Sequence, residues 1–454
     1  MSKEQGREKF GRLGFILVSA GCAIGIGNVW KFPYVAGQNG GAVFLLFYLF
    51  FLVIMGIPVL LMELSMGRAS RKSIVQSYKT LEKKGAKWHI HGWFCVAGSY
   101  LLMMYYTVVS GWMLAYFWKF ASGEFEGLKG EEVGAVFDNL LSNPAQMGIF
   151  TGIMVLGGFL VLSFGVKKGL ERVNKFMMTG LLLLIVVLAI KCVTLPNASE
   201  GLKFYLLPDL NRVRTGGFDK MVVAAMSQAF FTLSIGIGSM EIMGSYMAKD
   251  YTLAGEAVKI TALDTMVAFI SGLIIFPACF SFGVTPAEGP SLIFVALPHV
   301  FTDMSGGRIW GALFFLFMTF ASFSTVTAVF ENIVGSTMEN FKLSRTKTIL
   351  LNAVLLLVLS LPCILGFNLW QNFRPIAGRS VLESEDFIVS NILLPVGSLL
   401  FVIFCMYKFG WGADKFFAEA NEGAGLKISP KLILYFKFVL PALILLILIS
   451  GFIS

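Results

Sequence analysis

Two copies of one tetrapeptide, Ile24-Gly25-Ile26-Gly27 and Ile235-Gly236-Ile237-Gly238, lie inside long apolar runs of this 454-residue chain. Paired glycines disfavour a continuous helix, at a cost of about 1 kcal/mol each relative to alanine. In hydrocarbon, an interrupted turn also leaves backbone groups without partners, which is tolerated only where protein, water or ligand satisfies them. Either copy alone could instead be a close helix-packing surface. Two copies at matching places in the two halves favour a pair of broken helices that face one binding site.

The composition is that of a membrane protein. Hydrophobic residues make up 56% of the chain and charged residues 14%, which fits a polytopic helical membrane protein in contact with a lipid bilayer. The net charge of +9 does not indicate a nucleic-acid partner, because apolar spans separate the basic residues. The six cysteines form no C-x-x-C pair, so neither a zinc site nor a disulfide framework is expected.

The pattern predicts an all-α polytopic fold with eleven transmembrane helices. The apolar runs of spanning length fall at about 12–37, 42–67, 89–120, 147–165, 174–195, 219–246, 257–283, 308–335, 347–367, 387–407 and 432–453. A further run near 291–302 is too short to cross the bilayer. We expect it to form a re-entrant or surface helix on an extracellular loop.

Loop charge predicts the orientation. Lys and Arg gather before the first run, after the second, between the fourth and fifth, and between the eighth and ninth, whereas the loops after the third run and before the tenth are acidic or mixed. Because cytoplasmic loops are enriched in Lys and Arg, the amino terminus is expected inside and the carboxyl terminus outside. The basic loop at about 196–218 departs from this rule.

The two tetrapeptides lie in the first and sixth runs. An offset of five spans gives the second unit an inverted topology, as in many transporter repeats. We therefore expect one transmembrane domain over residues 1–454, with repeat one at about 11–195, repeat two at about 218–407 and an extra helix at about 431–453.

Asp264 lies well inside the seventh run, with no Lys or Arg at comparable depth in the sequence. An unpaired carboxylate in a membrane costs several kcal/mol, so it is expected to be protonated or to face a cation. One interpretation is a neutral acid hydrogen-bonded between helices, and the other is a ligand for a small hard cation, which prefers oxygen donors. Ser324 and Thr325 in the eighth run could supply oxygens for a second cation, although hydroxyls in helices often bond back to the preceding turn.

The two half-helices at the first break present opposite backbone groups to the gap between them. The half-helix that ends near Cys22 directs carbonyls into the gap, and the one that starts near Asn28 directs amide N–H groups there. Carbonyl ends suit a cation and amide ends suit a carboxylate, so a zwitterionic amino acid bound with a cation satisfies both. Tyr105 and Tyr106 add a candidate hydroxyl, although paired tyrosines are commonly packing residues.

These motifs resemble the neurotransmitter:sodium symporter family. The resemblance is carried by Ala20-Gly21-Cys22-Ala23-Ile24-Gly25-Ile26-Gly27-Asn28-Val29-Trp30-Lys31-Phe32-Pro33 with Asn39-Gly40-Gly41, by Ile57-Pro58, Glu63 and Gly67-Arg68, by Gln228-Ala229-Phe230-Phe231-Thr232-Leu233-Ser234-Ile235-Gly236-Ile237-Gly238, and by Gly412-Ala413-Asp414-Lys415. It spans about 10–415 in the family's order and is similar above all to the bacterial eleven-helix members of leucine-transporter fold, which include tyrosine and hydrophobic amino-acid transporters.

The resemblance implies two sodium sites, a substrate pocket and two gates. The first sodium would be held by Ala23, Asn28, Thr232 and Asp264 with the substrate carboxylate, and the second by Gly21, Ile24, Ala321, Ser324 and Thr325. The substrate would contact Cys22, Ala23, Ile26, Gly27, Leu102, Tyr106, Phe231, Ser234, Ile237, Thr325 and Val329. Lys31 and Asp386 would form an outer gate, and Arg7, Tyr246 and Glu339 match inner-gate positions.

The sequence departs from the family's pattern in three respects, which involve four residues. Lys31 stands where the family usually has arginine, so a bidentate latch becomes a point charge. Cys22 replaces a polar or acidic residue, which argues against a monoamine substrate that lacks a carboxylate of its own. Asp264 stands where many relatives have asparagine, and Ala268, one turn later, occupies a position used by chloride or a carboxylate in others. A fixed charge at Asp264 is expected to make chloride unnecessary.

The resemblance therefore implies a chloride-independent, sodium-coupled symporter in the bacterial cytoplasmic (inner) membrane. It would import a hydrophobic or aromatic L-amino acid, with tyrosine a candidate, by alternating access. A proton-coupled or sodium-independent exchanger and a non-transporting amino-acid sensor are the alternatives. An enzyme is not expected, because the sequence contains no metal cluster, nucleophile–base pair or phosphate loop in a polar segment. The residues leave open the amino acid, the sodium stoichiometry, proton counter-transport and the oligomeric state.

Overall fold

The computed structural model describes residues 8–283 and 291–453, except for the side chains of residues 215, 216, 452 and 453. Nine helical segments in this part of the chain have the length and composition to cross a membrane. They are Ala42–Ser70 (α3, η2 and α4), His89–Ser122 (α6), Pro144–Ser163 (α8), Val166–Val193 (η3 and α9), Leu253–Ser281 (α14), Gly307–Phe341 (α16), Arg345–Leu365 (α17 and α18), Val381–Met406 (α19, η5 and α20) and Pro430–Gly451 (η6, η7 and α22).

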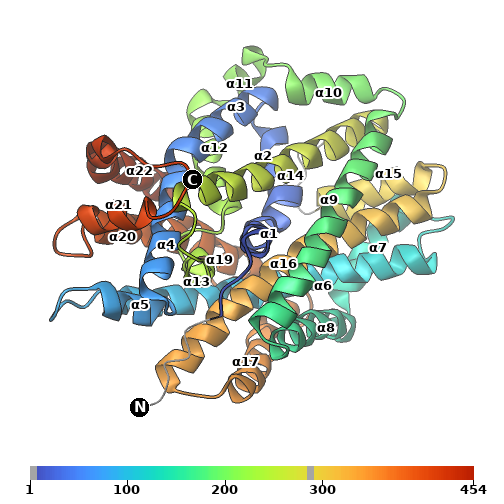
Figure 1. Cartoon of the computed structure of the whole chain (residues 1–454). Helices are drawn as coiled ribbons and strands as arrows, with labels where there is room; N and C mark the ends of the chain where they lie inside the picture. Colours follow the sequence, from blue (N-terminus) through green and yellow to red (C-terminus); the bar gives the residue numbers. More distant parts are fainter. Residues whose placement is uncertain (1–7, 284–290, 454) are drawn as a thin grey trace.

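Two further helical segments are broken, and the first of them passes as one bent span. The first consists of Arg12–Ala23 (α1) and Gly27–Gln38 (η1 and α2), which are bent by 56° relative to each other. The second consists of α12 (Phe218–Thr232) and α13 (Ser239–Ser245), with irregular backbone between them. Both glycine pairs therefore lie at interruptions of helical structure (Figure 1). With the bent pair counted as one span, the described residues contain up to ten spans, so the eleventh predicted span, at α12 and α13, stays a prediction.

Several short helices lie between the spans. The run near 291–302 forms a short helix as expected, made of η4 (Leu292–Ala296) and α15 (Leu297–Asp303). The sequence did not predict the others, because they are too short or too amphipathic to pass a test for spanning runs. These are α5 (Ile74–Leu81), α7 (Glu131–Ser142), α10 (Ala198–Leu206), α11 (Leu210–Gly216) and α21 (Ala413–Ala420).

The long helices α6 and α16 pack together through the middle of the molecule, with α1, α8 and α9 around them (Figure 1). Glycines allow several close approaches. A β-carbon at Gly111 of α6 would lie 2.9 Å from the Thr151 backbone nitrogen on α8, and one at Gly158 of α8 would lie 2.9 Å from the Phe330 ring on α16. Small residues bring helix backbones close enough to gain dispersion energy, which drives helix packing where lipid is as apolar as the side chains.

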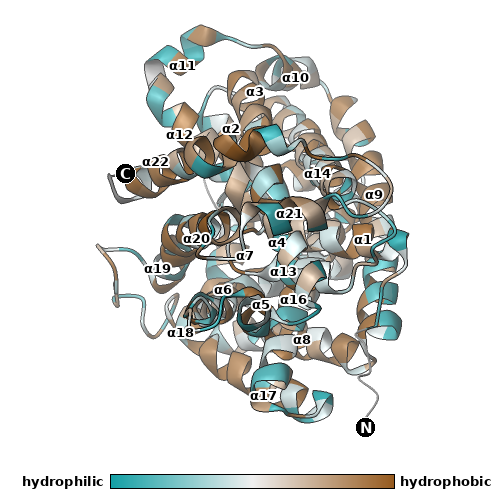
Figure 2. Cartoon of the chain, turned by 60° about the vertical axis from the view of Figure 1, so that its left-hand side comes forward, coloured by the Kyte–Doolittle hydropathy of each residue, from teal (hydrophilic) through white to brown (hydrophobic). Residues whose placement is uncertain are grey.

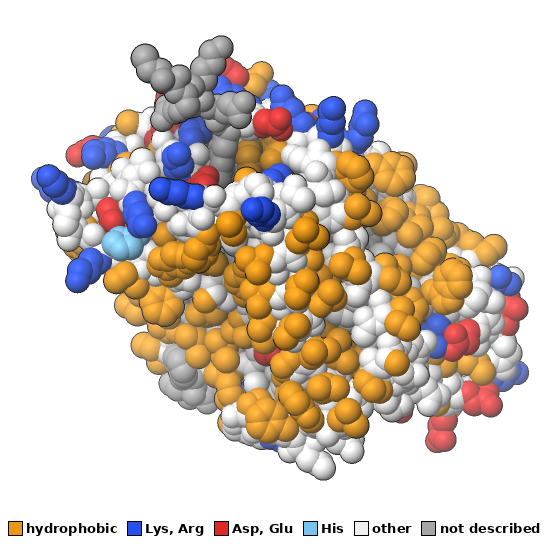
Figure 3. Space-filling model, turned by 90° about the horizontal axis from the view of Figure 1, so that it is seen from below, with side chains coloured by type: hydrophobic (Ala, Val, Ile, Leu, Met, Phe, Trp, Pro, Cys, Tyr) orange, Lys and Arg blue, Asp and Glu red, His pale blue; other side chains and the backbone are white. Residues whose placement is uncertain are grey.

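The outer surface is apolar along most of its length. Large hydrophobic side chains are exposed on the outermost helices, for example Phe176 and Leu183 on α9 and Leu350 and Val354 on α17. Figure 2 shows brown, apolar ribbon over the spans and teal ribbon mainly in the connecting segments. On the face shown in Figure 3, a broad apolar band lies between a region rich in Lys and Arg and a more acidic region. Such a continuous exposed band marks a membrane contact rather than an aqueous surface.

Lys31 lies at one end of the helix bundle and Arg345 at the other. The Lys31 end carries the carboxyl end of α2 and the start of α19, and the Arg345 end carries the start of α1 and the start of α17. At the Arg345 end, the fully buried Arg68 on α4 forms an ion pair with Glu419 on α21 at 2.6 Å and donates to the Tyr251 carbonyl at 2.8 Å. Two of the motifs quoted from the sequence, at the end of α4 and around α21, therefore meet in the fold.

Candidate functional site

The first break is short. α1 ends at Ala23, and Ile24 has extended backbone geometry (ψ 101°). Two amide groups freed by the interruption find side-chain partners: Gly25 N–H donates to Asn28 Oδ1 at 3.2 Å, and Ile26 N–H donates to Tyr106 Oη at 3.1 Å. A β-carbon at Gly25 would lie 2.3 Å from Tyr106 Oη, so a larger residue here would displace the hydroxyl that accepts from Ile26.

The second break is longer and depends on backbone that L-residues seldom adopt. Gly236 has φ 102°, Gly238 has φ 76°, and Ser234 has φ 52°. The buried carboxylate of Glu63 on α4 accepts the Gly236 N–H. Ser234 Oγ donates to the Cys22 carbonyl at 3.2 Å, which joins the two breaks directly. The two interruptions therefore face each other, as the sequence predicted.

Asp264 lies on α14 against both breaks and is fully buried. Its Oδ1 accepts from Asn28 Nδ2 at 2.7 Å, and its Oδ2 accepts from the Thr232 hydroxyl at 2.8 Å. Asn28 Nδ2 also lies 3.1 Å from Thr232 Oγ1. Ala23, the remaining predicted ligand, lines the adjacent cavity. The structure thus brings together the side chains predicted for the first sodium site, with neutral donors on the carboxylate.

A second group of oxygens gathers between α1 and α16. Ser324 Oγ donates to the carbonyls of Gly21 at 3.0 Å and Ala321 at 2.8 Å. Thr325 Oγ1 lies 3.2 Å from the carbonyls of both Gly21 and Ile24. All five residues predicted for the second sodium site therefore place oxygens within hydrogen-bond distance of one another. Three carbonyls and two hydroxyls are the donor set that a small hard cation prefers.

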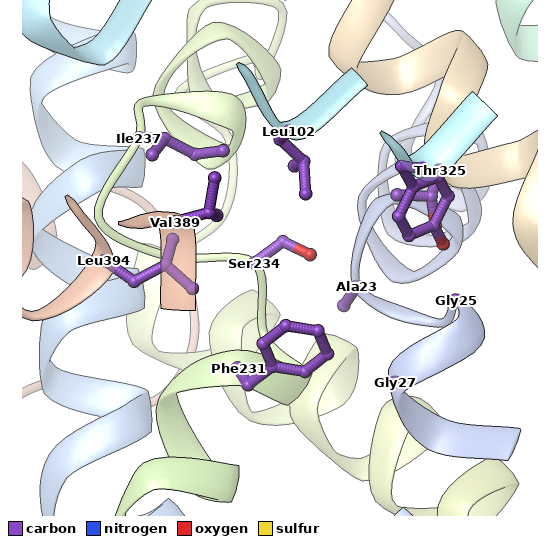
Figure 4. Close-up of a pocket in the computed structure, with 11 residues that line it drawn as sticks. Ala23, Gly25, Gly27, Leu102, Phe231, Ser234, Ile237, Thr325, Val389 and Leu394 are labelled. Atoms are coloured by element: carbon purple, nitrogen blue, oxygen red, sulfur yellow. The ribbon is translucent and has the colours of Figure 1, made fainter. Parts of the chain in front are cut away.

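A closed cavity lies between the breaks, with about 30 Å³ of open space, which is room for only a few water molecules. Leu102, Ile237 and Val389 form one side and Phe231 lies on the other, with Ser234 and Ala23 between them (Figure 4). None of the lining residues carries a charge. The lining residues are Ala23, Gly25, Gly27, Leu102, Tyr106, Phe231, Ser234, Ile237, Thr325, Val389 and Leu394.

Three of the predicted substrate contacts are not among the residues that line this cavity. Cys22 meets the cavity region through its carbonyl, which accepts from Ser234. Ile26 lines a separate vestibule at the Lys31 end, and Val329 is buried in the core of the bundle. Conversely, Gly25, Val389 and Leu394 line the cavity and were not predicted as substrate contacts. Val389 and Leu394 are ordinary apolar residues of a span whose carboxylates lie near its start, so no local signal marked them.

Phe231, Gly27 and Tyr106 line both the cavity and the vestibule, so the two spaces adjoin each other at these residues. The vestibule has a volume of about 570 Å³ and opens toward Lys31 and Asp386. Lys31 Nζ lies 3.7 Å from the centre of the Phe231 ring, 3.8 Å from Asp386 Oδ2 and 3.4 Å from Ser390 Oγ. Tyr105 donates to Asp386 at 3.0 Å. The residues predicted for the outer gate, Lys31 and Asp386, therefore lie together in the vestibule, beside the Phe231 ring.

At the Arg345 end, the predicted gate residues have partners that the sequence did not predict. Tyr246 Oη donates to Glu331 at 2.6 Å, and Arg345 binds both oxygens of the same buried carboxylate, at 3.1 and 2.6 Å. Glu339 accepts from the backbone and hydroxyl of Ser73, each at 2.7 Å. Arg7, the third predicted residue, lies outside the described residues.

Glu331 could have been found from the sequence. It is a carboxylate inside an apolar run, as Asp264 is, and Arg345 stands at the start of the next run. A buried carboxylate needs a cation or several donors, so the same reasoning applied to Glu331 points to Arg345 as its partner. The cluster of Tyr246, Glu331 and Arg345 borders a cavity of about 340 Å³ that Gly165, Val166 and Glu339 also line.

The fold and the site define a class: a multi-pass membrane transporter with two broken helices around a central site. Comparison with known proteins is consistent with this class. A family model described as "Sodium:neurotransmitter symporter family" matches residues 7–126 and 141–454. The chain belongs to this family, and it is a sodium-dependent transporter rather than an enzyme.

Relatives match along almost the whole chain. A Bacillus subtilis (strain 168) protein described as "Uncharacterized sodium-dependent transporter YhdH" is 33% identical over 452 residues, covering 99% of this chain and 98% of the relative. The sodium-dependent serotonin transporter of Drosophila melanogaster is 26% identical, covering 93% of this chain and 73% of that protein. The crystal structure of MhsT in complex with L-phenylalanine has a TM-score of 0.89 and 37% identity, covering 98% of this chain and 100% of that one.

Proposed function

We propose that the protein is a symporter that imports a hydrophobic or aromatic L-amino acid with sodium, by alternating access and without chloride. The observation that carries this proposal is the position of Asp264. Its carboxylate is fully buried between the two breaks, and its hydrogen-bond donors among the described residues are the neutral groups of Asn28 and Thr232. An uncompensated carboxylate at membrane depth costs several kcal/mol, which a bound sodium ion would offset.

Sodium binding is then required for the site to close around its substrate. A zwitterionic substrate brings an ammonium and a carboxylate into a site that already contains the Asp264 carboxylate. Burying these groups without sodium leaves a negative charge in a medium of low dielectric constant. The closed state is therefore favoured only when ions and substrate are bound together, and this differential binding couples the two fluxes. We assign one sodium to Ala23, Asn28, Thr232 and Asp264, and the other to Gly21, Ile24, Ala321, Ser324 and Thr325.

The cavity walls support an apolar side chain as the preferred substrate group. Leu102, Ile237 and Val389 offer only hydrocarbon, and Phe231 offers an aromatic face. A charged substrate side chain would lose its hydration there without gaining a partner. Tyrosine, phenylalanine, tryptophan and leucine are the candidates, and L-phenylalanine is the ligand named for MhsT. Because the cavity is closed to about 30 Å³, its walls separate to admit any of them.

The proposed orientation follows from the basic loops. The Arg345 end would face the cytoplasm and the Lys31 end the exterior, with the amino terminus inside and the carboxyl terminus outside. The proposed internal symmetry relates repeat one (about 11–195) to repeat two (about 218–407), because their broken spans are equivalent by position. The membrane would be the cytoplasmic membrane of a bacterium.

Uptake of radiolabelled amino acids into proteoliposomes tests the proposal. We expect accumulation under an inward sodium gradient, none when potassium replaces sodium, and better competition from tyrosine, tryptophan or leucine than from glycine, glutamate or lysine. Accumulation driven equally well by a proton gradient without sodium would favour the exchanger. Binding without accumulation would favour the sensor.

Asp264→Asn tests the independence from chloride. Wild-type uptake should persist when gluconate replaces chloride. The variant removes the fixed charge, so uptake in gluconate should fall at least tenfold and recover in part when chloride is added, since the anion can then supply the charge. Wild-type uptake that already requires chloride would contradict the assignment.

A further inference from the structure

A polar seam runs from the proposed second sodium site toward the Arg345 end, between α1 and the helix formed by η3 (Val166–Glu171) and α9 (Arg172–Val193). On the α1 side its surface is backbone, because Gly14 and Gly21 have no side chains. A β-carbon at Gly14 would lie 2.0 Å from Glu171 Oε1, and one at Gly21 would lie 3.2 Å from Asn174 Oδ1. Glu171 and Asn174 therefore rest directly on the α1 backbone.

Asn174 is fully buried, and its amide oxygen has no hydrogen-bond partner among the described residues. The orientation of the amide follows from its neighbours. Its Nδ2 lies 3.0 Å from the Leu170 carbonyl and 3.1 Å from the Thr327 hydroxyl. A carbonyl only accepts, and the Thr327 hydroxyl donates its own proton to the Ser324 carbonyl, so both positions require a donor from Asn174. The oxygen is left facing Gly21.

A buried amide oxygen without a donor costs about 1–3 kcal/mol, so its retention calls for a partner. The position of the amide oxygen, next to Gly21, indicates which partner it could have. Gly21 supplies a carbonyl to the second sodium site, where Ser324 and Thr325 bond to it. Asn174 Oδ1 lies against the same glycine, 3.2 Å from the position of a β-carbon at Gly21, beside Met178 and the second-site residue Ser324.

Glu171 continues the seam toward the Arg345 end. It precedes Asn174 by three residues, which is about 4.5 Å along a helix axis. Its carboxylate is mostly buried and is paired with Lys175, a partner whose own side chain is 39% exposed. Gly165 and Val166, at the start of the same helix, line the cavity of about 340 Å³ at this end. The helix that carries Asn174 and Glu171 therefore begins at this cavity and passes beside the proposed second sodium site.

We infer that Asn174 Oδ1 is a transient sodium ligand on the inner route from the second sodium site, and that Glu171 receives the ion next as Lys175 releases it. The inference rests on the proposed function. The ion leaves the Gly21 carbonyl for the Asn174 oxygen, and then exchanges that neutral oxygen for the carboxylate. Each step keeps an oxygen on the ion, so the ion is not stripped of ligands in a low-dielectric seam.

The variant Asn174→Leu keeps the volume and removes the oxygen. In proteoliposomes, maximal net uptake and the accompanying ²²Na⁺ influx should both fall about tenfold, since one ligand oxygen to a charged group is lost on the route. Equilibrium binding of ²²Na⁺ and of amino acid to the purified protein should stay within twofold of wild type. Asn174→Ala should give a smaller slowing, because a water molecule can occupy the space. It also serves as the second variant if Asn174→Leu folds poorly.

Met178→Leu is the matched control, since the Met178 sulfur contacts the same Gly21 without offering a hard oxygen ligand. It should leave both uptake and binding within twofold of wild type. Net uptake unchanged in Asn174→Leu would overturn the inference, as would equilibrium sodium binding that falls in parallel with uptake, which indicates a purely structural role. A wild-type protein that binds no ²²Na⁺ would instead refute the proposed function itself.

Discussion

The two broken helices satisfy their freed backbone groups in different ways. At the first break, carbonyls of Gly21 and Ile24 face hydroxyls of α16, which can turn to make room for a cation. At the second break, the freed Gly236 amide faces a carboxylate of the protein itself, Glu63. The carbonyls of the first break would be completed by the proposed cation, whereas the Gly236 amide of the second break is satisfied by the chain itself. Only the first is therefore expected to depend strongly on sodium.

The comparison predicts that the largest loss of stability comes from Glu63→Leu. The substitution leaves the buried amide of Gly236 without an acceptor and places hydrocarbon against an irregular backbone. We expect the free energy of unfolding to fall by about 3 kcal/mol, measured as a lower apparent melting temperature in detergent. Glu63→Gln keeps an acceptor oxygen and should lose much less. Equal stability of wild type and Glu63→Leu, with or without sodium, would show that the second break does not need its carboxylate.

Alanine at a glycine of each break should separate stability from ion binding. At Gly236 the residue has φ 102°, and a β-carbon would lie 2.3 Å from the Leu394 carbonyl, so Gly236→Ala should lower the free energy of unfolding by about 2 kcal/mol. At Gly25 a β-carbon meets the ends of two side chains, Tyr106 and Thr325, which can rotate away. Gly25→Ala should therefore fold while sodium-dependent amino-acid binding falls at least tenfold. A loss of stability in Gly25→Ala, or a loss of binding without a loss of stability in Gly236→Ala, would contradict this difference between the two breaks.

Thr325→Val removes one proposed ligand of the second sodium and keeps the shape of the side chain. The sodium concentration for half-maximal amino-acid binding should rise about tenfold, since a polar contact to a charged group is worth about 1.5 kcal/mol or more. Ser322→Ala on the same helix is the control, because among the described residues the Ser322 hydroxyl bonds to the preceding turn alone, at the Thr319 carbonyl. An identical shift in both variants would place the effect in helix packing rather than in the ion site.

The smallest effect is expected far from both breaks, at Lys249 and Glu422, which pair at 2.8 Å at the Arg345 end. The hydrogen bond from Lys249 lowers the pKa of Glu422 below its ordinary value, so the pair stabilises the fold at neutral pH and this contribution is lost as the pH falls through the lowered pKa. Both side chains are exposed to solvent, so Lys249→Ala should cost roughly 0.5 kcal/mol or less. A larger loss at pH 7, or the same loss at pH 3, would contradict this assignment.

The sequence predicted the features that depend on local chemistry. Paired glycines marked both interruptions, and Asp264 was found because a carboxylate is conspicuous among apolar neighbours. The comparisons and the structure confirm the family and the all-helical membrane fold. The convergence of Asn28, Thr232 and Asp264 agrees with the predicted first site, whereas the binding of sodium there stays a prediction.

What the sequence missed depends on packing between distant segments. Val389 and Leu394 are ordinary apolar residues of a spanning helix, and only the approach of that helix to the second break turns them toward the cavity. The amphipathic helices α5 and α21 are short, and their placement is decided by what covers them rather than by their own propensity. Asn174 carried no signal at all, because an asparagine in a span is equally compatible with an ordinary interhelical hydrogen bond.

The span formed by α19, η5 and α20 touches three places that otherwise lie apart. Asp386 faces Lys31, Val389 and Leu394 form part of the cavity wall, and a β-carbon at Gly397 would lie 1.8 Å from the Gly236 carbonyl. A substrate bound in this cavity, as proposed, would pack against Val389 and Leu394. We therefore expect the width of its side chain to shift this span and, with it, the distance between Asp386 and Lys31.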